Sequence, residues 1–138
     1  MEVRTYDFFP KEGREIREIV FVEEQGFQEE FDDVDDVATH LLVFKDGQAI
    51  ATCRYFYSST LNEYLVGRIA VLKEYRGMGI GAFMLRKTRE ILAEKGIRRV
   101  YLHAQKRVRT FYEKQGFVPI GKEDEEEGVP HLWMQMEW

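Results

Sequence analysis

The sequence of 138 residues has a single cysteine, three prolines and no long apolar segment. One cysteine, Cys53, excludes an internal disulfide and any metal site built from several cysteines. No apolar run approaches the roughly 20 residues that a membrane-spanning helix needs, and residues 1–10 lack the basic and apolar regions of a signal peptide. We therefore expect a cytoplasmic protein without membrane contacts, folded as one domain over residues 1–138.

Charge is divided unevenly along the chain, although the formal net charge is only −5. Residues 68–114 contain 13 lysines and arginines but 4 aspartates and glutamates, whereas residues 23–36 contain eight carboxylates and no cation. We expect the basic part to meet an anionic ligand and the acidic stretch a cationic one. The five consecutive acids at 123–127 are interpreted as a solvated surface. Nucleic acid is not an expected partner, because the chain is acidic overall and lacks a recognisable binding motif.

Hydrophobic periodicity and turn signals predict an α/β fold with the order β-α-β-β-β-α-β-α-β-β and helices on both faces of a central sheet. The Asp46-Gly47 pair is typical of a tight hairpin between the second and third strands. Strands are predicted at 3–8, 39–45, 49–57, 65–72, 99–104, 117–120 and 131–137, with the acidic run at 123–127 separating the last two. Helices are predicted at 11–25, 80–95 and 107–114, each ending at or near a glycine.

A glycine-rich turn at residues 76–81, Arg-Gly-Met-Gly-Ile-Gly, follows a predicted strand and opens a helix. Glycines let the backbone turn tightly and expose bare N–H groups, and the helix N-terminus adds further donors, so the turn suits a phosphate group. It is not a P-loop, because the Gly-Lys-Ser/Thr ending is absent, and Met84 stands where a dinucleotide-binding fingerprint needs a small residue. From the residues alone, glycines that only shape the turn remain an alternative.

Two segments resemble the GNAT acetyltransferase superfamily. Residues 67–81 are similar to the family's acyl-CoA signature, Arg/Gln-x-x-Gly-x-Gly/Ala, which is matched at Arg76, Gly79 and Gly81. Residues 104–105 and 111–117 resemble the family's late strand and the helix that bears its catalytic tyrosine. The resemblance implies a mixed, mostly antiparallel sheet flanked by helices on both faces. Shorter matches resemble a small bacterial ElaA-like branch of the family, at Glu24-Gln25, 33–36 and Pro130-His131.

The resemblance also implies that acetyl-CoA is the cosubstrate. In the family, backbone amides of the glycine turn bind the pyrophosphate of coenzyme A, a role that falls here to Arg76, Gly77, Met78, Gly79, Ile80 and Gly81. The strand before the turn is bulged and would pair its backbone with the pantetheine arm, through Ile69, Ala70 and Val71. Divergence of this strand from the one at 101–104 would open the cleft. Gln105 stands where many members carry an asparagine that contacts the cofactor.

Acetyl transfer is expected to be direct, with a neutral amine attacking the thioester and expelling a thiolate. Tyr112 occupies the family's position for the acid that protonates the sulfur. The spacing of Val108, Phe111 and Tyr112 equally predicts a buried helix stripe, which is the alternative role of this tyrosine. A backbone N–H of the bulged strand, that of Val71, would steady the oxyanion.

Several groups compete for the role of the base that removes a proton from the amine. Glu24 leads, because the first helix borders the acceptor side in this family; the alternatives are a water relay or a histidine, among His40, His103 and His131. The three histidines are isolated in the sequence and show no metal-ligand spacing, so no metal is expected. Cys53, in mid-strand, is interpreted as a core thiol rather than as an acetyl-accepting nucleophile.

The expected function is acetylation of a primary amine, and a domain that holds acyl-CoA for sensing without turnover is the competing function. A small cationic amine fits the acidic stretch at 23–36, and charge reversal at Asp33 and Asp36 would then raise the KM for that amine. A lysine side chain or a peptide N-terminus is the macromolecular alternative. A homodimer is conceivable through the last strand, whose large apolar residues would invite a partner at a sheet edge: Leu132, Trp133, Met134 and Trp138. The alternative is that the same residues close the core.

Overall fold

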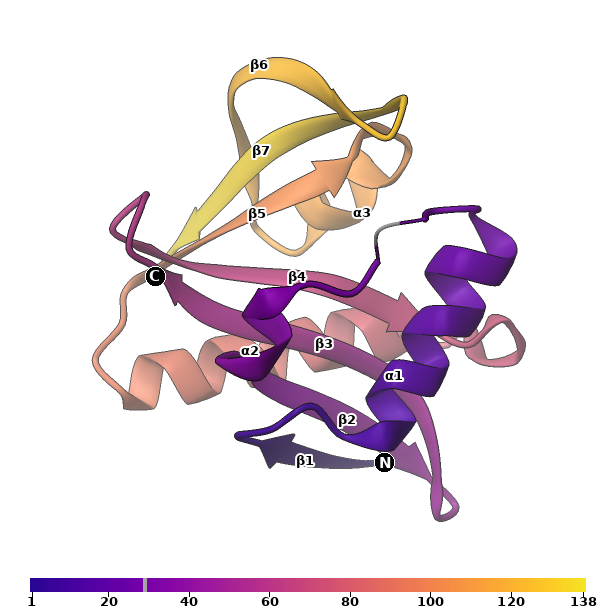
Figure 1. Cartoon of the computed structure of the whole chain (residues 1–138). Helices are drawn as coiled ribbons and strands as arrows, with labels where there is room; N and C mark the ends of the chain where they lie inside the picture. The colour runs from indigo at the N-terminus through magenta and orange to yellow at the C-terminus, as the bar shows by residue number, and fades with distance from the viewer. Residues whose placement is uncertain (29) are drawn as a thin grey trace.

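Seven strands form one sheet with helices on both faces in the computed structural model, which describes residues 1–28 and 30–138 (Figure 1). The strands are β1 (Glu2–Tyr6), β2 (Thr39–Lys45), β3 (Gln48–Ser58), β4 (Glu63–Val71), β5 (Arg99–Gln105), β6 (Val118–Glu126) and β7 (Val129–Glu137). The helices are α1 (Lys11–Arg17), its continuation as a π-helix (Glu18–Glu24), α2 (Ile80–Glu94) and α3 (Arg109–Lys114). Short 3-10 helices lie at Asp33–Asp36, Lys73–Tyr75 and Lys106–Val108. The predicted order of strands and helices is confirmed.

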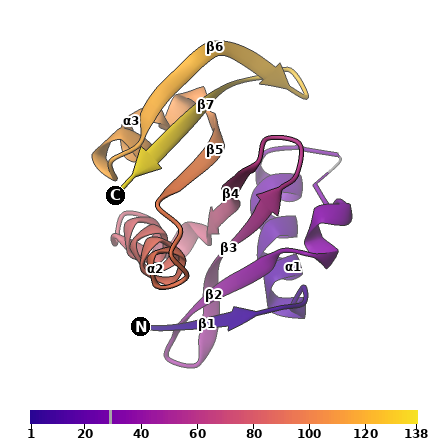
Figure 2. The ribbon, with the colours of Figure 1, turned by 90° about the vertical axis from the view of Figure 1, so that its left-hand side faces the viewer.

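The sheet is divided into two parts at the boundary between β4 and β5 (Figure 2). Its strand order is β1-β2-β3-β4-β5-β7-β6, and neighbouring strands are antiparallel except β4 and β5, which run parallel. Among the described residues, Leu65 and Tyr101 are the one pair in register between these two strands. Beyond this pair β4 and β5 separate, as both views of the ribbon show. The predicted divergence of the two strands is confirmed.

A bulge in β4 bends this strand where it leaves β5. The register between β3 and β4 shifts between Thr52 and Arg54, which leaves β4 with an extra residue. Arg68, at the bulge, has a φ of 50°, a left-handed conformation that costs a residue with a side chain roughly 1–2 kcal/mol. Its guanidinium lies 2.9 Å from the carboxylate of Glu30, an ion pair that holds the strained residue in place.

Apolar residues at alternate positions of the central strands fill both faces of the sheet. In β2, Leu41 and Val43 belong to one core cluster together with side chains of α2, α3 and β7. Leu42 and Phe44 point to the other face and join a second cluster with residues of α1 and the π-helix. The sheet is therefore covered by α1 on one face and by α2 and α3 on the other. No helix in the described part of the chain is long and apolar enough to span a membrane.

Two expectations about the end of the chain are wrong. β7 lies between β5 and β6 rather than at an edge, and Leu132 and Met134 are buried in the core. The acidic run at 123–127 does not separate the last two strands, because most of it belongs to β6, which extends to Glu126 and forms the edge. A highly charged edge strand discourages pairing with another chain. The homodimer expected through the last strand therefore loses its basis.

Candidate active site

A cleft of about 1080 Å³ lies where β4 and β5 separate, and it brings together nearly all of the residues selected from the sequence. Its walls include the predicted residues of β4, of the glycine turn, of β5, of α3 and of the π-helix: Ile69, Ala70, Val71, Arg76, Gly77, Gly79, Ile80, Gly81, Gln105, Tyr112 and Glu24. Met78, whose side chain is largely exposed, is the selected residue that does not line the cleft. The candidates for cofactor binding, acid and base thus surround one space.

The glycine turn presents backbone donors to this cleft. Gly77 and Gly79 have φ values of 78° and 76°, in the left-handed region that favours glycine. Gly79 is also the N-cap of the 15-residue helix α2, so no side chain caps the first turn of that helix. The free N–H groups and the positive end of the helix dipole make this end of the cleft suitable for an anion such as a pyrophosphate.

Gly81 sets the distance between α2 and α3. A Cβ atom at this position would lie 3.1 Å from Cζ of Phe111, so a larger residue would push the ring away. The Phe111 ring in turn meets the ring of Tyr112 edge-on, with centroids 5.1 Å apart. The third glycine of the turn therefore allows the close packing that places Tyr112 near the helix N-terminus.

Arg76 and Glu24, selected for different roles, bind each other. Nη1 and Nη2 of Arg76 each lie 2.9 Å from a carboxylate oxygen of Glu24. The Nε of Arg76 donates to the backbone carbonyl of Val71, also at 2.9 Å. The guanidinium thus joins the end of the π-helix to the end of β4, and it holds Glu24 in the cleft.

Tyr112 is both a core residue, as its helical spacing predicts, and part of the cleft wall. Its side chain is 8% exposed, belongs to the larger core cluster and packs edge-on against Phe117. It also lines the cleft. Burial raises the pKa of its phenol, and the nearby charge of Arg107 only partly offsets this effect. The hydroxyl therefore stays protonated at neutral pH, as an acid must.

Gln105 connects the π-helix end to β5 across the separated strands. Its Nε2 donates to Oε1 of Gln25 at 2.8 Å, and its own Oε1 accepts from Nε of Arg107 at 3.0 Å. The amide is therefore fixed in orientation while it lines the cleft. This position is compatible with the cofactor contact that the resemblance implies.

The buried acids of the stretch at 23–36 are neutralised inside the protein. Arg17, which is 1% exposed, lies 2.9 Å from Glu30 and 2.6 Å from Asp35, and Arg54 lies 2.7 Å from Asp35. Burial alone would raise the pKa of Asp35, but the hydrogen bonds and charges of the two arginines lower it. These carboxylates hold a loop onto the sheet and are not free to bind a cationic ligand.

The exposed acids of the same stretch lie apart from the cleft. Asp33 and Asp36 are exposed and, in the described part of the chain, neither forms part of the cleft wall. Glu29, which also belongs to the stretch, lies outside the described residues. Apart from Glu24 and the buried Glu30, the carboxylates that line the cleft belong to the β6–β7 hairpin. The structure gives no support for an acceptor site at Asp33 and Asp36.

Two further candidates are structural residues. Cys53 is 1% exposed, its Sγ lies 3.6 Å from the hydroxyl of Thr88, and burial raises the pKa of its thiol to about 12. The interpretation of Cys53 as a core thiol is confirmed. His40 is also 1% exposed, stacks on Phe9 and lies 2.9 Å from the carbonyl of Asp35. Because it is enclosed in the core away from the cleft, His40 is no longer a candidate for the base.

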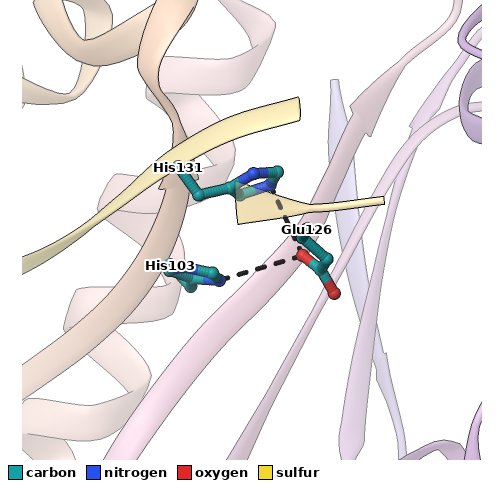
Figure 3. A group of neighbouring side chains, drawn as sticks. All are labelled: His103, Glu126 and His131. Carbon is teal, nitrogen blue, oxygen red and sulfur yellow. Dashed lines mark ion pairs between the residues drawn. The ribbon is translucent and has the colours of Figure 1, made fainter. Parts of the chain in front are cut away.

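The structure brings His103 together with two residues from a later part of the sequence, Glu126 and His131 (Figure 3). The two imidazole rings lie 4.7 Å apart, and all three side chains line the cleft. His103 and His131, which are isolated in the sequence, are therefore neighbours in the structure. The signal that could have revealed the pair is the register of β5 and β7. This register places Gln105 opposite His131, so that His103, two residues before Gln105, is the diagonal neighbour of His131.

Solved structures that superpose on this chain include a member of the GNAT acetyltransferase family. The crystal structure of Escherichia coli ElaA superposes with a TM-score of 0.87 at 28% identity and covers 99% of this chain and 100% of that one. A GNAT family acetyltransferase from Elizabethkingia anophelis with acetyl-CoA bound has a TM-score of 0.76 over 99% of this chain and 97% of that one. At 14% identity, this second likeness shows the fold alone.

The sequences of related proteins lead to the same family. A family profile described as acetyltransferase (GNAT) domain matches residues 10–138. The Bacillus subtilis protein YyaT is 34% identical over 131 residues, which cover 91% of this chain and 87% of YyaT. Escherichia coli ElaA is 33% identical over 128 residues, which cover 89% of this chain and 84% of ElaA. The chain belongs to the GNAT acetyltransferase family.

Proposed function

We propose that the protein is an N-acetyltransferase that moves an acetyl group directly from acetyl-CoA to a primary amine. The observation that carries this proposal is the cleft between β4 and β5, which is lined by the glycine turn, the bulged strand and Tyr112. Membership of the family, and the acetyl-CoA bound to a family member of the same fold, support the choice of donor. The acceptor is a small cationic amine, a lysine side chain or a peptide N-terminus.

Different residues of the cleft bind different parts of the donor, acetyl-CoA. The pyrophosphate lies at the glycine turn, where backbone amides and the N-terminus of α2 supply hydrogen-bond donors and Arg76 supplies a positive charge. The pantetheine arm adds to the free side of β4 as an extra strand would, along Ile69, Ala70 and Val71. Met78, whose side chain is largely exposed, lies between Gly77 and Gly79 and offers its backbone N–H. Gln105 offers its oriented amide to the same ligand.

The transfer requires one group that accepts a proton and one that donates it. The neutral amine attacks the thioester carbon, a C–N bond forms, the C–S bond breaks and sulfur leaves with the electron pair. Glu24 accepts the proton that the amine loses, and Tyr112 donates its phenolic proton to the sulfur. A backbone N–H of β4, that of Val71, steadies the oxyanion.

The proposal is tested by measuring coenzyme A release from acetyl-CoA with a panel of amines. The panel covers polyamines, aminosugars, amino acids, and peptides with a free lysine or N-terminus. A thiol reagent can follow the release, because the protein's own cysteine is buried. Release stimulated by one class of amine supports the proposal and identifies the acceptor. Binding of acetyl-CoA without release by any amine would favour the sensing domain instead, and absence of binding would contradict both functions.

A further inference from the structure

Three side chains of the cleft direct lone pairs to a common point. His103 lies in β5, Glu126 at the end of β6 and His131 near the start of β7 (Figure 3). Oε2 of Glu126 lies 3.4 Å from Nε2 of His131 and 3.8 Å from Nδ1 of His103. The potential ligand atoms of the three residues lie within 4.8 Å of one another. His131 is buried, whereas the side chain of Glu126 is 47% exposed and has room to adjust.

The other nitrogen of each ring is already engaged, which fixes the position of its proton. Nδ1 of His131 lies 2.7 Å from the carbonyl oxygen of Val129, which can only accept, so Nδ1 carries the proton. Nε2 of His103 lies 2.7 Å from Oδ1 of Asp124, which places a proton on Nε2 in the same way. In the neutral rings, the two nitrogens that face Glu126 are therefore unprotonated. Hydrogen bonds of this kind orient histidines that bind metals.

Two of the three ligand separations favour a metal ion over an ammonium group. Ligands that lie about 2.0–2.1 Å from a tetrahedral zinc ion are about 3.3 Å from one another. Acceptors that surround an ammonium group at about 2.8 Å are about 4.6 Å from one another. Two of the three separations, 3.4 and 3.8 Å from Oε2 of Glu126 to the two rings, are nearer to the first value, and the third, between the two ring nitrogens, is at most 4.8 Å. A proton on one ring would satisfy only that ring and leave the other lone pair facing the carboxylate.

We propose that His103, Glu126 and His131 bind one divalent transition-metal ion of the zinc type. Two imidazoles and one carboxylate form a ligand set that zinc sites combine with water or substrate in the fourth position. All three ligands line the cleft, so the fourth position opens toward it. The ion balances the charges of Glu126 and Asp124 and ties the β6–β7 hairpin to β5. Binding of the metal does not depend on the proposed acetyl transfer, and its test needs neither donor nor acceptor.

The test is equilibrium dialysis of the untagged, metal-stripped chain against Zn²⁺, with the bound metal measured by elemental analysis. We expect one ion per chain, and Co²⁺ in its place should show the intense visible absorption of a tetrahedral site. Glu126→Gln, His103→Ala and His131→Ala should each weaken Zn²⁺ binding by at least about tenfold. Asp124→Ala, which removes the partner of His103, should weaken it by about 10–100-fold.

Glu125→Gln is the matched control, because Glu125 neighbours Glu126 on the same strand, points to the other face and does not line the cleft. It should change the affinity by less than about twofold, and circular dichroism should show that each variant retains its fold. The proposal is overturned if the wild-type chain binds no stoichiometric Zn²⁺. It is equally overturned if Glu125→Gln weakens binding as much as Glu126→Gln, which would indicate general attraction to an acidic hairpin.

Discussion

The carboxylate of Glu24 and the guanidinium of Arg76 form a two-point ion pair in the cleft, with both N–O distances at 2.9 Å. The two residues come from different elements, Glu24 from the end of the π-helix and Arg76 from the glycine turn. A phosphate that binds Arg76 competes with Glu24 for the same guanidinium. Donor binding is therefore expected to release the carboxylate that then accepts the proton of the amine.

Substitution of either partner tests this competition. Glu24→Gln removes the competing charge, so the affinity for acetyl-CoA should rise. We expect a rise of about two- to fivefold, which corresponds to the free energy of a partly exposed ion pair. The same substitution should lower kcat. Arg76→Ala should weaken acetyl-CoA binding instead, because a phosphate contact is lost. Calorimetric titration measures both affinities. Weaker acetyl-CoA binding in Glu24→Gln would contradict the competition, and an unchanged kcat would exclude Glu24 as the base.

Tyr112→Phe tests the acid. The phenylalanine ring retains the packing against Phe117 but lacks the proton that the thiolate needs. We expect kcat to fall by about 10²–10⁴-fold, the usual contribution of a general acid, with acetyl-CoA affinity and thermal stability nearly unchanged. Phe117→Leu serves as a packing control, since it should lower stability and leave the phenol in place. If Tyr112→Phe retained the wild-type kcat, Tyr112 would be a core residue only.

Asp35→Ala tests the structural role of the acidic stretch. The substitution leaves Arg17 and Arg54 buried without their shared partner, so the free energy of unfolding should fall by about 3–5 kcal/mol. Asp36→Ala, one residue away and exposed, should change it by less than about 0.5 kcal/mol. Urea denaturation measures both values. Equal effects of the two substitutions would show that the buried ion pairs do not hold this loop.

The thiol of Cys53 should be unreactive in the native protein. Burial raises its pKa to about 12, so a thiol reagent should modify Cys53 only after unfolding. Between pH 9.0, the ordinary pKa of the thiol, and about pH 12, the folded chain keeps this proton whereas the unfolded chain loses it. The free energy of unfolding should therefore decline as the pH rises through this range. Cys53→Ala should make that decline shallower. Rapid native modification at pH 8 would contradict the buried environment.

Local signals in the sequence predicted most of the fold and of the donor end of the site. Asp46 and Gly47 have φ values of 51° and 80°, as the hairpin turn requires, and β2 has the predicted bounds. The glycine turn begins α2 at Ile80 as expected. In these segments, the backbone conformation depends on the residues themselves and their immediate neighbours. The extent of the domain, residues 1–138, stays a prediction.

What the sequence did not reveal depends on contacts between distant segments. The position of β7 between β5 and β6 is a matter of strand order, which no local pattern encodes. The pairing of Arg17 with Asp35 and the meeting of His103 with His131 follow from that tertiary arrangement. The change from α1 to a π-helix after Arg17 was likewise missed, because both helices bury one apolar stripe.

The most direct test of the central claim is acetyl-CoA binding by wild type, Gly79→Ala and Gly47→Ala, measured by calorimetry. Gly79 and Gly47 have φ values of 76° and 80°, so alanine imposes similar backbone strain at both, but only Gly79 lies at the cleft. We predict that wild type and Gly47→Ala bind acetyl-CoA alike, whereas Gly79→Ala binds at least about tenfold more weakly. Wild-type affinity in Gly79→Ala, or no binding by the wild type, would contradict the assignment of the glycine turn to the donor.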